Sequence, residues 1–115
     1  MLTELKIGNR TYPLTFGIKF IREMDKRYTV KNDKSGISYG FGVGMSVVYI
    51  EQRNPVVLID LIQASTATEK TKPSVEEIEN FLETNTDLEK LFKDFLSVLE
   101  KSPLTKNMMA KFKEE

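Results

Sequence analysis

The sequence predicts an α+β fold that is mostly α-helical, with an N-terminal β-hairpin packed on a bundle of five to six helices. Three observations predict it. A turn pair, Gly8–Asn9, separates two short extended segments at the N-terminus. Most of the remaining apolar residues recur at helical spacing. Residues 54–68 are so apolar that a helix there must be covered by its neighbours. With 115 residues, we expect a single domain, 1–115.

The composition excludes several classes of chemistry. The chain has no cysteine and no histidine, which removes disulfides, thiolate or imidazole metal sites and cysteine nucleophiles. It has no N-terminal signal pattern and no apolar stretch of about 18 residues, so we expect a soluble intracellular protein. No metal or cofactor is expected.

The formal net charge is zero, but it is unevenly distributed. Residues 1–53 carry nine basic and five acidic side chains, and residues 54–115 carry eight and twelve. Neither half has the dense basic patch of a nucleic-acid-binding protein. The two halves could attract one another, within a subunit or between subunits.

Residues 2–14 are predicted to form the hairpin. A two-residue turn at Gly8–Asn9 pairs Leu5 with Tyr12 and supplies the positive backbone angles that hairpin turns need. Pro13 places the second strand at an edge or ends it. One face carries the apolar residues, which should lie on helices: Leu5, Ile7, Tyr12 and Leu14.

The helical body is predicted to span residues 16–101. Its first helix, 16–28, has an apolar stripe, Phe20, Ile21, Met24 and Tyr28, and a basic face that we interpret as solvated rather than as a nucleic-acid surface. Residues 29–44 follow as an irregular, glycine-rich connector. It lacks the strand and the Lys-Ser/Thr pair of a phosphate-binding loop, and the carboxylates of a calcium loop. Residues 45–53 suit a strand or a buried helix, and we favour helix.

The apolar helix 54–68 should begin with Asn54 as N-cap and Pro55 in its first turn. Asp60 interrupts it, and we interpret this carboxylate as structural, at the edge of the apolar surface. Two capping boxes, Ser74 with Glu77 and Thr86 with Glu89, predict two further helices. Residues 74–100 hold eight acids and two lysines, which fits a solvated face better than an acidic docking surface.

The C-terminal segment 103–115 has apolar residues at roughly helical spacing, Leu104, Met108, Met109 and Phe112. Two alternatives remain open: a mobile segment that presents this stripe to a partner, or a helix packed back on the body.

Six segments carry a resemblance to a known family: GNRTYPL, FGIKFIREMDKRY, GISYGFGVGM, NPVVLIDLIQAST, KPSVEEIENFLE and DLEKLFKDFLSVLEKS. In this order, and over nearly the whole chain, they resemble the small tail assembly chaperones of long-tailed phages and prophages of Gram-positive bacteria. The most telling patterns are F-G-I-x-F-I-R-E-M-D-K-R-Y and N-P-V-x-L-x-D-L-I-x-A.

The resemblance implies a non-enzymatic protein of the host bacterial cytoplasm, absent from the mature virion. It would bind the tape measure protein and keep it soluble and extended until tail tube protein polymerises around it. A longer frameshifted form would recruit the tube protein, and this chain looks like the short form. A chaperone that coats a long client is expected to be a homo-oligomer, with neither nucleic acid nor membrane as a partner.

Such a role needs exposed apolar side chains rather than an acid–base pair. The candidate partner-binding residues are Phe41, Met45, Met108, Met109 and Phe112. The alternative function is a structural virion component, such as a head–tail adaptor or a tail completion protein. A hydrolase or transferase is disfavoured because Asp25, Asp60 and Asp94 have no recognisable catalytic spacing.

Overall fold

The computed structural model describes residues 1–31, 34 and 38–113, with side chains at these positions except 30–31, 38–39 and 110–113. The elements follow the order β1 (Glu4–Ile7), β2 (Arg10–Pro13), α1 (Ile18–Arg27), β3 (Thr29–Lys31), β4 (Ser38–Gly40), α2 (Gly42–Glu51), α3 (Val56–Ser65), α4 (Val75–Glu83), α5 (Leu88–Lys101) and α6 (Lys106–Lys113). The predicted class, mostly helical α+β with an N-terminal hairpin, is confirmed.

The N-terminal hairpin has the predicted register. β1 and β2 are antiparallel, Leu5 lies opposite Tyr12, and Gly8 in the turn has a φ of 63°. The turn therefore uses the left-handed conformation that glycine adopts without a steric penalty. Ile7 and Tyr12 are buried, so the apolar face of the hairpin is part of the core.

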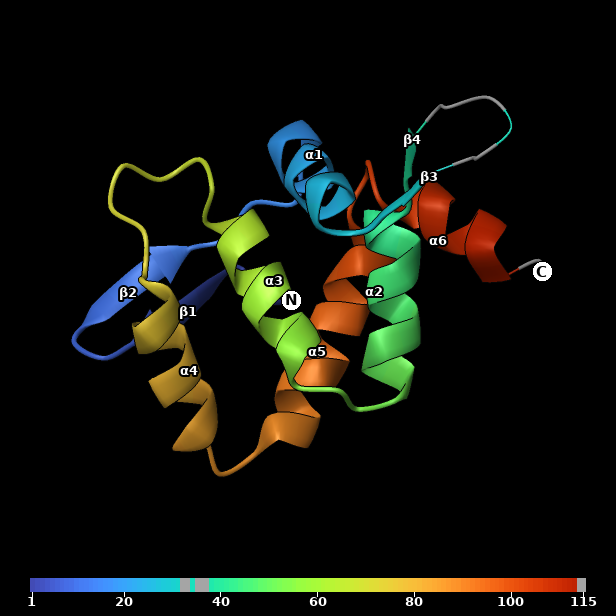
Figure 1. Ribbon diagram of the computed structural model, residues 1–115. Helices are drawn as coiled ribbons and strands as arrows, with labels where there is room; N and C mark the ends of the chain where they lie inside the picture. The colour runs from blue at the N-terminus through green and yellow to red at the C-terminus, as the bar shows by residue number, and fades with distance from the viewer. Residues whose placement is uncertain (32–33, 35–37, 114–115) are drawn as a thin grey trace.

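The helices pack around one core (Figure 1). α2 and α3 lie side by side with α5 behind them, and α1 packs across both α2 and α3. α4 and the β1–β2 hairpin lie at one side, and α6 and the β3–β4 hairpin lie at the other. The apolar segment from which the fold was predicted is α3, and it contributes three side chains that are completely buried: Leu58, Leu61 and Ile62.

Of the three predicted helix starts, one is correct, one is displaced by one residue and one is wrong. Asn54 Oδ1 accepts a hydrogen bond from the N–H of Val56 at 3.0 Å, as expected of a capping side chain, but Pro55 is the N-cap and α3 begins at Val56. Ser74 and Glu77 form the reciprocal capping box, in which each side chain accepts from the backbone N–H of the other residue. The predicted Thr86 box is wrong, because Asp87 caps α5 by accepting from the N–H of Lys90 at 3.1 Å. Glu89 is thereby free to pair with Arg53.

The prediction for residues 29–44 is also partly wrong. β3 and β4 form a second antiparallel hairpin, and α2 begins at Gly42, so that two of the glycines belong to a helix. Gly36 lies outside the described residues. The prediction of helix rather than strand for residues 45–53 is confirmed as far as Glu51, where α2 ends. Along the described chain, no helix is long and apolar enough to cross a membrane.

Candidate partner-binding surface

Phe41 and Met45 lie at the start of α2. Phe41 is the residue before the helix and is 49% exposed, although its N–H donates to the carbonyl of Tyr28 at 2.8 Å. Met45 follows one turn later and is half-buried, and its N–H donates to the carbonyl of Phe41. The backbone of Phe41 is therefore held at both its N–H and its carbonyl, while its phenyl ring remains accessible.

The C-terminal candidates separate into different environments. α6 packs against α2 and α5, and Met108 is 37% exposed. Met109, its neighbour, is only 2% exposed, so it is a core residue and not available to a partner in this conformation. The side chain of Phe112 lies outside the described residues. Leu104, at the turn before α6, is exposed.

A buried hydroxyl group positions α6. Thr105 Oγ1 donates to the carbonyl of Leu99 at 2.7 Å, which ties the turn after α5 to its last turn. The carbonyl of Thr105 in turn accepts from the N–H of Met109 at 3.0 Å. This arrangement directs Met109 inward and leaves Met108 at the surface, a distinction that helical spacing in a terminal segment did not reveal.

The fold brings two candidates from distant parts of the chain toward one end of the molecule. Phe41 immediately precedes α2, Met108 belongs to α6, and α6 lies beside the N-terminal part of α2 (Figure 1). Both side chains are apolar and accessible, so this end of the molecule presents apolar surface from two helices.

Sequence reasoning missed a notch beside α2. Its volume is about 260 Å³, and its walls come from the residue that follows α1, from α2, and from α3 with the segment before it. The lining residues are Tyr28, Tyr49, Asn54, Val56, Val57 and Asp60. The rings of Tyr28 and Tyr49 meet with their centroids 5.6 Å apart, and Val56 at the mouth is 59% exposed. The only available signal was the apolar residue Val56 at the start of an otherwise buried helix.

Asp60 contacts two neighbouring side chains at this notch, which agrees with the structural role predicted for it. Its Oδ2 accepts a hydrogen bond from the Tyr28 hydroxyl group at 2.5 Å, and its Oδ1 lies 3.6 Å from Nε of Arg27. Burial and the adjacent Asp60 carboxylate raise the pKa of Tyr28, so its hydroxyl group stays protonated and acts as a donor to the carboxylate.

Three of the four basic residues of α1 share one acidic partner on the same helix. Glu23 forms ion pairs with Lys19, Lys26 and Arg27 at distances between 3.0 and 3.5 Å. Hydrogen bonds from Lys26 and Arg27 lower the pKa of Glu23 to about 2. These contacts fit a solvated, self-paired helix face.

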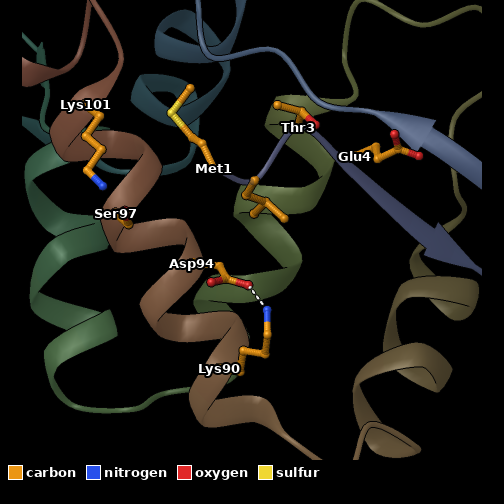
Figure 2. A pocket seen from close by; sticks show the side chains of 8 residues that line it. Met1, Thr3, Glu4, Lys90, Asp94, Ser97 and Lys101 are labelled. Atoms are coloured by element: carbon orange, nitrogen blue, oxygen red, sulfur yellow. Dashed lines mark hydrogen bonds and ion pairs between the residues drawn. The ribbon is translucent and has the colours of Figure 1, made fainter.

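A second, polar depression of about 360 Å³ lies between the first four residues and α5. Figure 2 shows the side chain of Lys90 reaching Asp94 on the same helix, α5. Ser97 and Lys101 follow further along this helix. The Lys90–Asp94 ion pair is 2.7 Å long and exposed. Two of its charged groups, Lys90 and Asp94, therefore already pair with each other.

The three aspartates considered for catalysis lie in separate environments. Asp25 accepts from the backbone of Gly42, Asp60 from Tyr28, and Asp94 from Lys90. No group of three or more acidic residues suited to a metal ion occurs among the described residues. The arrangement can bind apolar surface, and it assembles no acid–base pair from these aspartates.

Comparison with known proteins identifies a family. The family model described as phage tail assembly chaperone protein, TAC, matches residues 4–114. No curated protein and no solved structure matches the chain. The family match covers every helix and strand described above.

Proposed function

Because the chain belongs to the phage tail assembly chaperone family, we propose that it binds the tape measure protein and keeps it soluble and extended for tail tube polymerisation. Its place of action is then the cytoplasm of the infected bacterium, and it leaves the tail before the virion is complete. A longer form of the same gene product, with an added C-terminal domain, would contact the tube protein.

The observation that carries this proposal is the exposed apolar surface at the N-terminal end of α2 and on α6. Phe41 and Met108 are accessible; Phe41 immediately precedes α2, Met108 lies on α6, and these two helices pack together. A protein that keeps a long apolar client in solution must offer apolar side chains of its own, in many weak contacts rather than one tight one. The role is non-enzymatic, and the pairing of Asp25, Asp60 and Asp94 with neighbouring groups supports that.

Co-expression with the tape measure protein tests the proposal. We expect the unmodified chain to increase the soluble fraction of the tape measure protein, and the double variant Phe41→Ser/Met108→Ser to lose most of that effect. Val75→Ser is the matched control, because Val75 is also an exposed apolar residue, 46% accessible, but lies on α4 at the other side of the molecule.

Two results would contradict the proposal. One is a tape measure protein whose solubility does not change when the chain is co-expressed. The other is detection of the chain by mass spectrometry as a stoichiometric component of purified virions, which would favour the structural alternative, a head–tail adaptor or tail completion protein.

A further inference from the structure

α2 has an accessible face without charge. From Gly42 to Ile50 the helix contains no charged residue. One side of it is buried against α1, α3 and α5, and α6 packs beside its N-terminal part. Phe41 is nevertheless exposed, and three further side chains are only half-buried: Met45, Val48 and Tyr49. A helix that is apolar all round is normally covered on every side. This face therefore has the composition of an interface.

The same face carries both a projection and a hollow. Phe41 projects at one end of α2, and the notch of about 260 Å³ opens beside Tyr49, eight residues further along. A closed apolar cavity of about 150 Å³ is enough to bind benzene. The notch is thus large enough for a phenyl ring, and its tyrosine and valine side chains match one chemically, while Asn54 and Asp60 form the polar part of its wall.

The spacing makes this face complementary to itself. Phe41, Met45 and Tyr49 are four residues apart, so they form one ridge along the helix of about 12 Å. We propose that a second copy of this chain docks here, with the two α2 helices antiparallel about a two-fold axis. Phe41 of each copy then enters the notch beside Tyr49 of the other, and Met45 lies on the axis.

Charge permits this arrangement and favours it over a parallel one. No like charges face each other along Gly42–Ile50, and antiparallel helices place the positive end of each macrodipole beside the negative end of the other. At the rim of the notch, Arg27 and Asp60 pair with each other, so the hollow has no uncompensated charge that would reject an apolar side chain. Gly44, on the same side of α2, lets the two backbones approach closely.

The inference divides the candidate residues between two partners. Phe41 and Met45 make the contact between copies, so the dimer covers Phe41 and offers Met108 with Leu104 to the client, whereas the dissociated chain offers Phe41 to the client as well. It goes beyond the proposed function and does not depend on it, because self-association is measured on the chain alone.

Cysteine cross-linking tests the pairing directly, since the chain has no cysteine of its own. With a short bis-maleimide reagent, Met45→Cys should form a covalent dimer by itself. Phe41→Cys and Tyr49→Cys should each cross-link weakly alone and strongly when mixed, because the antiparallel arrangement brings 41 of one copy to 49 of the other. Val75→Cys on α4 is the control for random collision.

Sedimentation of the chain without cross-linker supplies the second measurement. We expect a dimer at micromolar concentration and a dissociation constant raised at least about tenfold in Phe41→Ser, with thermal unfolding showing that this variant still folds. A monomer throughout, as expected if only the client occupies this face, would overturn the inference. So would Met45→Cys cross-linking no better than Val75→Cys, or Phe41→Cys cross-linking best with itself.

Discussion

Asp25 Oδ1 accepts a hydrogen bond from the backbone N–H of Gly42 at 2.9 Å, joining the last turns of α1 to the first residue of α2. At this point the helices are so close that a Cβ on Gly42 would collide with the backbone of Met24. The carboxylate satisfies an N–H group that α2 itself leaves without a partner, and it lies at the positive end of the helix dipole. The contact fixes where α2, and thus Phe41, begins.

Gly42→Ala should therefore destabilise the protein, by about 1 to 3 kcal/mol, because the added methyl group has rigid backbone rather than a flexible side chain in its way. Urea denaturation measures the change. Gly17→Ala is the control, since a methyl group there meets open space, and it should cost less than about 1 kcal/mol. Equal stabilities of the two variants would show that α1 and α2 are not in close contact.

The ion pairs of Glu23 predict a pH dependence of stability. Hydrogen bonds from Lys26 and Arg27 lower the pKa of Glu23 in the folded protein to about 2, from an ordinary value of 4.5. A depressed carboxylate pKa contributes stability that is present above about pH 4.5 and is lost as the pH falls toward 2. Because the three basic partners are at least partly exposed, we expect this contribution to be at most about 1 kcal/mol.

Comparing urea midpoints at neutral and acidic pH measures this effect. In Glu23→Gln, the loss of stability on acidification should be smaller than in the unmodified chain. Glu76→Gln, which changes an exposed glutamate of α4, should leave the pH profile as it was. An unchanged profile in Glu23→Gln would show that the ion pairs do not contribute to folding.

At the N-terminus of α5, the neighbouring residues Thr86 and Asp87 should contribute differently to stability. Asp87 supplies the hydrogen bond to the N–H of Lys90, so Asp87→Ala should cost about 1 kcal/mol. Thr86→Ala should cost much less, although Thr86 with Glu89 has the capping-box spacing. Chemical denaturation measures the free energy of unfolding of both variants. A larger loss in Thr86→Ala than in Asp87→Ala would mean that Thr86, as its spacing from Glu89 predicted, caps α5.

Patterns within a few residues predicted the helices and strands. The predictions failed where contacts between distant helices determine the structure. The hairpin register follows from Gly8–Asn9, and the capping box from Ser74 and Glu77, because these signals act within a few residues. The role of Gly42 depends on how closely α1 crosses α2, and the Tyr28–Asp60 hydrogen bond joins residues 32 positions apart. No periodicity along the chain encodes either contact, so the notch beside α2 was not foreseeable.

The last helix, α6, shows the same limit of prediction from sequence patterns. Met108 and Met109 are adjacent and chemically identical, yet Met109 is 2% exposed and Met108 is 37% exposed. Met109→Ala should cost about 2 to 5 kcal/mol, since it leaves a cavity where α6 meets the body. Met108→Ala should change stability by less than about 0.5 kcal/mol. Thermal and urea unfolding measure both, and similar small effects at the two positions would mean that α6 is not anchored through Met109.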